Sequence, residues 1–170
     1  MSTAVPAAST ASHARIGHVN LSVGDLDRSL SFYRDVLGMT VQKRIGDAAA
    51  FMSFGHYHHD LCINTWHSKA GSAPPKGSTG LFHFAITYRA LAELQAACNH
   101  VLASGIAIDD VVDHGPSLSV YLRDPDQNGV ELNWDRPAET WWSADGSLQM
   151  GHRRITLDEL LSAAEAVNPA

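Results

Sequence analysis

The chain has 170 residues, 45% of them hydrophobic and 18% charged, which allows one domain or two small modules that share a core. Twelve Lys and Arg against eighteen Asp and Glu give a formal net charge of −6 without any basic run, which argues against nucleic-acid or anionic-membrane partners. No apolar stretch is long enough to span a bilayer, and two cysteines make no disulfide framework, so we expect a cytoplasmic protein. Ten histidines, spread along the chain, are the unusual feature.

Two stretches of small and polar residues bound the patterned regions. The first, MSTAVPAASTASH, lacks the charged start and the apolar run of a secretory signal, and it predicts a disordered tail over 1–14. The second is rich in Gly, Pro and Ser and predicts a linker loop over 68–80. The patterned regions that follow these two stretches are 15–67 and 81–137.

Region 15–67 predicts a strand, a helix and three further strands. Polar and apolar residues alternate from His18 to Val23, which indicates a half-buried strand. Asp25 is a candidate N-cap for a helix that Gly38 ends. The further strands are expected at about 39–45, 49–54 and 59–66.

Region 81–137 repeats this order. His83 lies 65 residues after His18, and Leu91 lies 65 residues after Leu26. The sequence therefore predicts an α+β fold built from a duplicated βαβββ module. The expected elements are a strand over 82–87, a helix from Leu91 that Gly105 ends, and strands at about 106–113, 117–123 and 129–134.

Residues 138–170 predict a C-terminal extension. The pair Trp141-Trp142 lies in a turn-rich stretch, and Thr156 with Glu159 forms a capping box that starts a short amphipathic helix. We expect this helix to pack against the domain and to cover a sheet edge or the entrance of a site.

Three possible metal ligands share one orientation in their strands. Because strand side chains alternate in direction, His18, His83 and Glu131 all point away from the apolar, helix-facing residues. If the sheets curl around a cavity, these side chains can meet as a facial triad of two imidazoles and a carboxylate, which suits Fe(II) and, less well, Mn²⁺ or Zn²⁺. Each residue taken alone is more often an ordinary strand residue. The matching positions of the two histidines in the repeats favour the metal site.

At these residues the sequence resembles the vicinal-oxygen-chelate superfamily, whose fold is paired βαβββ modules. The resemblance covers about residues 15–137. Its motifs are Gly17-His18-Val19, Asp25-Leu26-Asp27-Arg28-Ser29-Leu30-Ser31-Phe32-Tyr33, Leu81-Phe82-His83-Phe84-Ala85-Ile86 and Asp124-Pro125-Asp126-Gln127-Asn128-Gly129-Val130-Glu131.

The stretch from His114 to Pro125, HGPSLSVYLRDP, is similar to the signature of type I extradiol catechol dioxygenases, and Glu131 follows Tyr121 by the ten residues of that signature. One departure is Gln127, which stands where the signature has Gly or Pro. The resemblance implies that the Fe(II) ligands are His18, His83 and Glu131.

The resemblance also implies roles for three further residues. Tyr121 would hydrogen-bond the metal-bound oxygen of the substrate, and His114 would orient Tyr121 or close the pocket. His59 would be the acid–base residue. It is preferred to its neighbours His56, His58 and His67.

The implied function is a metal-dependent extradiol ring-cleaving dioxygenase that acts on a catechol with O₂, in a homodimer. One alternative is another three-ligand metal enzyme of this fold: glyoxalase-like, an isomerase, or a fosfomycin-type thiol transferase. Another is a metal-free protein that sequesters a small molecule, which the intact ligand set disfavours. Glyoxalases use a fourth ligand, and the corresponding region Cys62–Asn64 offers no carboxylate.

Overall fold

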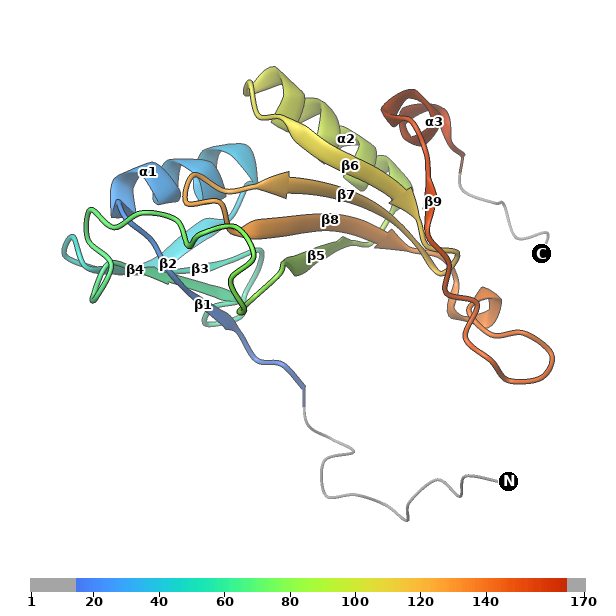
Figure 1. Ribbon diagram of the computed structural model, residues 1–170, viewed down its shortest axis with the longest axis horizontal. Helices are drawn as coiled ribbons and strands as arrows, with labels where there is room; N and C mark the ends of the chain where they lie inside the picture. The colour runs from blue at the N-terminus through green and yellow to red at the C-terminus, as the bar shows by residue number, and fades with distance from the viewer. Residues whose placement is uncertain (1–14, 165–170) are drawn as a thin grey trace, which may run out of the picture.

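The computed structural model describes residues 15–164, so the predicted disordered tail over 1–14 lies outside the described residues. The chain forms two mixed sheets with helices, which confirms the predicted α+β fold of paired βαβββ modules (Figure 1). In the first sheet, of order β1-β4-β3-β2, only the pair β1–β4 is parallel. Its strands are β1 (Val19–Ser22), β2 (Thr40–Ile45), β3 (Ala49–Ser53) and β4 (Leu61–Asn64).

The second sheet repeats this arrangement and adds one short strand. Its order is β5-β8-β7-β6-β9, and only the pair β5–β8 is parallel. Its strands are β5 (Phe84–Tyr88), β6 (Ile108–Asp113), β7 (Ser117–Arg123), β8 (Gly129–Asp135) and β9 (Arg153–Arg154).

The first helix is less regular than its spacing predicts. Asp25 caps α1 (Leu26–Ser31) by accepting a hydrogen bond from the Arg28 amide at 3.0 Å. The chain then continues as a π-helical turn, η2 (Phe32–Val36). The side chains of Phe32 and Tyr33 in this turn are both buried in the core.

The second helix, α2 (Leu91–Ala103), packs its apolar face on the second sheet. Leu94 and Cys98 of the helix, with Val130 and Leu132 of β8, are fully buried in the hydrophobic core. In Figure 1 both α1 and α2 lie on the upper side of the sheets, and the lower side carries neither helix. The polar residues of the strands are therefore left to face that lower side.

The predicted strand over 59–66 is shorter in the structure, where β4 begins at Leu61. Asp60 ends the preceding turn instead of extending the strand. Its carboxylate accepts hydrogen bonds from the Ser53 hydroxyl at 2.7 Å and from the Phe54 amide at 3.1 Å. His59 therefore lies in the turn between β3 and β4.

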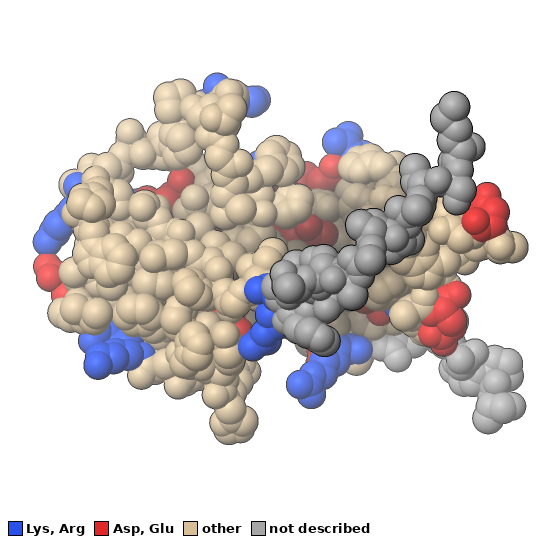
Figure 2. All heavy atoms as spheres, turned by 90° about the horizontal axis from the view of Figure 1, so that it is seen from below, with Lys and Arg blue, Asp and Glu red and all other residues tan. Residues whose placement is uncertain are grey.

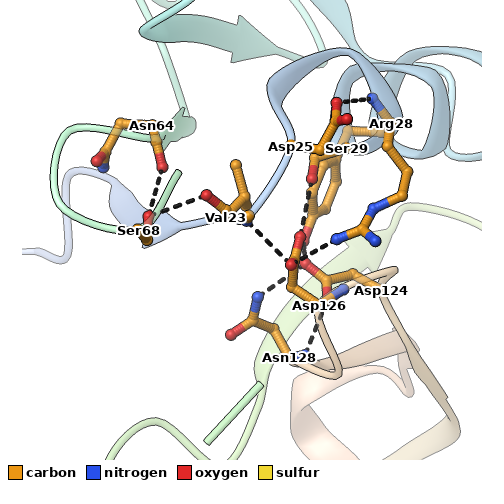
Figure 3. Close-up of polar contacts among 11 residues, drawn as sticks. Val23, Asp25, Arg28, Ser29, Asn64, Ser68, Asp124, Asp126 and Asn128 are labelled. Atoms are coloured by element: carbon orange, nitrogen blue, oxygen red, sulfur yellow. Dashed lines mark hydrogen bonds and ion pairs between the residues drawn. The ribbon is translucent and has the colours of Figure 1, made fainter. Parts of the chain in front are cut away.

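The two modules are joined by buried carboxylates in the turn between β7 and β8 (Figure 3). Asp126 accepts hydrogen bonds from the Gly24 amide at 3.0 Å, the Arg28 guanidinium at 2.6 Å and the Ser29 hydroxyl at 3.1 Å. Asp124, also buried, accepts one from the Tyr33 hydroxyl at 2.8 Å. We call Asp124 and Asp126, with these four partners, the module clamp.

The C-terminal extension is anchored at its helix. Thr156 caps α3 (Leu157–Ser162) through the predicted capping box with Glu159, and the side chain of Leu160 is fully buried. Gln95 of α2 donates hydrogen bonds of 2.9 Å to the carbonyl groups of Leu160 and Ala163. A short 3-10 turn, η3 (Ala138–Thr140), begins the extension.

Within residues 15–164, no helix is long and apolar enough to cross a membrane. Figure 2 looks at the side without α1 and α2, and there the charged side chains form small separate groups.

Candidate functional site

Three of the predicted site residues share the polar face of the second sheet. His83 lies one residue before β5, and Tyr121 of β7 is the register partner of Glu131 of β8. Phe84, Val130 and the other residues that alternate with them pack under α2 instead.

These side chains form a continuous hydrogen-bonded chain. His83 Nε2 lies 2.9 Å from Glu131 Oε2, and the Tyr121 hydroxyl lies 3.2 Å from Glu131 Oε1. The same hydroxyl lies 2.8 Å from His114 Nε2, and His114 Nδ1 lies 2.8 Å from the Gly151 carbonyl oxygen. The structure thus brings together four of the predicted residues: His83, His114, Tyr121 and Glu131.

The Gly151 carbonyl fixes which nitrogen of His114 carries a proton. A carbonyl oxygen can only accept, so His114 Nδ1 must be the donor in this contact. In a neutral imidazole, His114 Nε2 is then an acceptor for the Tyr121 hydroxyl. Burial, and next the negative charge of Glu131, raise the pKa of Tyr121 to about 12, so this hydroxyl keeps its proton.

His18 and His59 contact each other and are not part of this hydrogen-bonded chain. The His18 side chain is exposed, and its ring centroid lies 4.3 Å from that of His59. The His59 ring also meets the Phe51 ring edge-on at 5.1 Å, and its Nδ1 lies 2.6 Å from Nδ1 of His58. Burial, and next the neighbouring His18 and His58, lower the pKa of His59.

One cavity connects the two groups of histidines. It has a volume of about 1070 Å³, and His18 and His83 both line it, together with residues of β1 and β5. Over residues 15–164, no three His, Cys, Asp or Glu side chains lie close enough together to hold a metal ion. The strands β1 and β5 belong to different sheets, so no hydrogen-bonded register fixes the distance from His18 to His83.

The donors on the second sheet fit neighbouring ligands of a divalent ion. Two ligands at about 2.1 Å from a metal and at right angles to each other are about 3.0 Å apart. The 2.9 Å between His83 Nε2 and Glu131 Oε2 matches that separation. His83 Nδ1 is buried and has no hydrogen-bond partner among the described residues, so its ring is held in the site through Nε2 alone. His18 contacts His59 and is not part of this pair.

The first module carries a cysteine where the second module carries Glu131. Cys62 of β4 is the register partner of Asn20, two residues after His18, just as Glu131 is the partner of Ala85, two residues after His83. Cys62 is thus the counterpart of Glu131. Burial raises the pKa of the Cys62 thiol, so it stays neutral, and this position offers no carboxylate.

Sequence reasoning missed the part of the site that the C-terminal extension supplies. Gly151 accepts the hydrogen bond from His114 across 37 residues, and the His152 ring centroid lies 5.5 Å from that of His114. No periodicity or motif marks Gly151 and His152, because only the tertiary fold brings the extension to this face.

The departure at Gln127 has a backbone consequence. Gln127 has a φ of +67°, in the left-handed region where a residue with a Cβ is strained. The glycine in the signature is the residue that adopts this conformation without strain. The turn nevertheless keeps its shape, because Asp124 accepts hydrogen bonds from the amides of Asp126 at 2.9 Å and Asn128 at 2.8 Å.

Compared with known protein families, residues 15–132 match the Glyoxalase/Bleomycin resistance protein/Dioxygenase superfamily. A catechol-2,3-dioxygenase of Bacillus subtilis (strain 168) is 36% identical over 150 residues, which are 88% of this chain and 52% of that protein. The chain therefore spans about half the length of that relative. A biphenyl-2,3-diol 1,2-dioxygenase of Rhodococcus globerulus is 32% identical over 133 residues, 77% of this chain and 68% of that protein.

Lactoylglutathione lyases are also similar to the chain. The crystal structure of such a lyase from Agrobacterium tumefaciens superposes with a TM-score of 0.57 at 25% identity, over 72% of this chain and 95% of that one. Proteins named as probable lactoylglutathione lyases match in sequence as well. The relatives thus include both dioxygenases and lyases.

Proposed function

We propose, from the premise that the chain belongs to the glyoxalase/bleomycin resistance protein/dioxygenase superfamily, that it is an extradiol dioxygenase, which cleaves the ring of a catechol with O₂. The observation that carries this proposal is the contact chain from His83 through Glu131 and Tyr121 to His114. It places a hydrogen-bond donor beside two candidate metal ligands.

The metal ligands would be His18, His83 and Glu131, with Fe(II) as the metal and Mn²⁺ or Zn²⁺ as possible substitutes. Fe(II), when bound, would supply the activation of O₂ and lower the pKa of the catechol hydroxyls. Three protein ligands leave positions open for both catechol oxygens, and this requirement distinguishes a catechol site from one closed by a fourth ligand.

The remaining roles belong to side chains that contact the candidate metal ligands or lie in hydrogen-bonded contact with such a side chain. Tyr121 keeps its proton, which His114 Nε2 accepts in this structure, and would redirect that proton to a substrate oxygen when the substrate binds. His59 lies beside His18, and its lowered pKa favours the neutral imidazole that a general base requires. His59 would take a proton from the catechol and return it later.

Two observations favour the dioxygenase over a lyase. The counterpart of Glu131 in the first module is the neutral Cys62, so the chain lacks a carboxylate at that position for a fourth ligand. Tyr121 and His114 are also spaced as in the extradiol signature and lie in contact. The predicted homodimer and cytoplasmic location remain predictions.

The direct test is reconstitution with Fe(II) without air, followed by addition of catechol and air. We expect O₂ uptake in proportion to catechol and a yellow ring-cleaved product. A protein that binds Fe(II) but consumes no O₂ with any catechol, and instead shows lactoylglutathione lyase activity, would contradict the proposal.

A variant tests the ligand assignment. We expect His83→Ala to lose at least tenfold in Fe(II) affinity while its thermal unfolding changes little, since His83 is half-buried and bonds only through Nε2. The control is His67→Ala, an exposed histidine in the loop after β4. Metal analysis of both untagged variants measures the bound iron, and thermal unfolding measures their stability. Stoichiometric iron in His83→Ala would remove His83 from the ligand set.

A further inference from the structure

A second cavity, of about 520 Å³, adjoins the site on the side of the C-terminal extension. His83, His114 and Tyr121 line it from the second sheet, and His152 and Arg154 line it from the extension. The extension lies beyond residues 15–132, which carry the family match. One wall of this cavity is therefore built by a part of the chain that the family domain does not include.

The backbone of residues 149–154, which we call the strap, is held firmly against the turn between β6 and β7. The Gly151 amide donates to the His114 carbonyl at 2.7 Å, and His114 Nδ1 donates to the Gly151 carbonyl at 2.8 Å. A Cβ built on Gly115 would lie 2.4 Å from the Gln149 carbonyl oxygen, so the strap and the turn meet backbone to backbone. The register partners Asp113 and Arg153 continue this contact into β9.

The His152 side chain contributes nothing comparable to this anchoring. It is exposed, and within the described residues its contact is the tilted one between its ring and that of His114, with 57° between the planes. The fold does not need this imidazole, which the strap nevertheless presents to the cavity.

The arginine side chains that line the cavity are each paired with an aspartate. Arg154 is paired with Asp110 at 2.9 Å, and Arg123 with Asp109 at 3.0 Å. Both guanidinium groups that line the cavity are thus already neutralised by a carboxylate. The Phe82 ring, with 76% of that residue exposed, adds an apolar surface beside His83. The cavity therefore suits an uncharged group that packs against rings.

We propose that His152 is a specificity-determining residue, whose ring forms the wall that receives an uncharged substituent of the catechol ring. The inference rests on the proposed function for the identity of the ligand. In this proposal the C-terminal extension selects among substituted catechols, and the residues of the second sheet bind the catechol oxygens.

The test compares binding of catechol, 3-ethylcatechol and 4-ethylcatechol by calorimetry, without air, to the full chain loaded with Zn²⁺, so that no turnover is needed. We expect His152→Ala to weaken binding of at least one ethylcatechol about fivefold, the size of one lost ring contact, and to leave catechol binding unchanged. His152→Phe, which keeps a ring, should restore the preference. His67→Ala is the matched control and should bind all three like the wild type.

The outcomes separate the two proposals. The role of His152 as the wall would be contradicted if His152→Ala and the wild type bound the ethylcatechols with equal affinity. It would also be contradicted if His152→Phe behaved like His152→Ala. If 3,4-dihydroxybenzoate bound more tightly than the ethylcatechols, the claim that the substituent is uncharged would be wrong. If no catechol bound to the wild type, both proposals would be wrong. If the ethylcatechols bind in a His152-dependent way but the Fe(II) protein consumes no O₂, the dioxygenase proposal fails and the binding wall stands.

Discussion

Tyr121 can serve a substrate only as a hydrogen-bond donor. With its pKa raised to about 12, the hydroxyl keeps its proton over the range in which the protein would work, and two acceptors compete for that proton. If the neutral His114 accepts it, the 3.2 Å contact between the hydroxyl and Glu131 Oε1 has no proton of its own. To donate to a substrate, the hydroxyl would therefore turn its single proton away from both His114 and Glu131.

We therefore expect Tyr121→Phe to lower kcat roughly 100-fold, as does the removal of one well-placed donor from an active site. Fe(II) affinity should change little, because the ligands are retained. Steady-state kinetics and metal analysis measure the two quantities. A Tyr121→Phe protein with unchanged kcat would remove Tyr121 from the site.

Gln127 is a residue at which the backbone conformation opposes the side chain. Its φ of +67° strains any residue with a Cβ, so we expect Gln127→Gly to raise the free energy of unfolding by about 1 kcal/mol. The control is Gln42→Gly in β2, where φ is not positive and the same exchange should destabilise. Urea unfolding measures both, and destabilisation by Gln127→Gly would contradict the reading of the turn.

At the scale of elements, the strap extends the second sheet beyond β6. Asp113 anchors it, because its carboxylate receives the Arg136 guanidinium at 2.9 and 3.1 Å and the Arg153 guanidinium at 3.0 Å. These ion pairs add to the two register pairs of β9 and to the hydrogen bonds between His114 and Gly151. The position of His152 in the second cavity therefore depends in part on a residue that lines neither cavity.

Asp113→Asn should lower the free energy of unfolding by about 1–3 kcal/mol at neutral pH, since charged hydrogen bonds are lost. Burial alone would raise the pKa of Asp113, but the hydrogen bonds from Arg136, Gly115 and Arg153 outweigh it, and the pKa is lowered. A lowered pKa gives stability that is present above the unfolded value of about 3.9 and lost as the pH falls through the folded value.

The difference between the wild type and Asp113→Asn should therefore stay constant from about pH 7 to about pH 5 and shrink as the pH falls below the unfolded pKa of about 3.9. Thermal unfolding at several pH values measures it. Asp109→Asn, which removes the exposed pair with Arg123, is the control and should cost less than about 1 kcal/mol. A difference that stays constant with pH would show that the charge of Asp113 is not what anchors the strap.

At the scale of the whole molecule, the candidate metal ligands come from both modules. His18 belongs to the first module, and His83 and Glu131 to the second, and no hydrogen-bonded register joins β1 to β5. The module clamp of Figure 3 fixes α1 to the turn before β8. The geometry across the large cavity thus depends on the clamp.

Asp126→Ala should lower the free energy of unfolding by about 2–3 kcal/mol, because it leaves the Gly24 amide and the buried Ser29 hydroxyl without an acceptor. It should also weaken Fe(II) binding, although Asp126 is not a ligand, because His18 and His83 are then less well placed. Urea unfolding and metal titration measure the two effects. The control is Asp35→Asn, which breaks an exposed pair with Arg34. If Asp126→Ala lost stability but kept its metal affinity, the clamp would not be what positions the metal ligands.

Patterns along the chain were enough to predict the modules and the polar face. Period-two alternation places His83 and Glu131 on one side of their sheet, and the order of elements repeated after 65 residues predicts the fold. The structure adds that Tyr121 and Glu131, ten residues apart, are register partners in an antiparallel pair of strands.

The structure was needed to find how the site is completed. It shows the π turn after α1 and the contact of His18 with His59, and it brings Gly151 and His152 to His114. These features depend on how separate elements pack, which follows from the sum of many weak contacts and leaves no periodic mark in the sequence. The distance between His18 and His83 is of this kind, because two sheets with no shared hydrogen bonds set it.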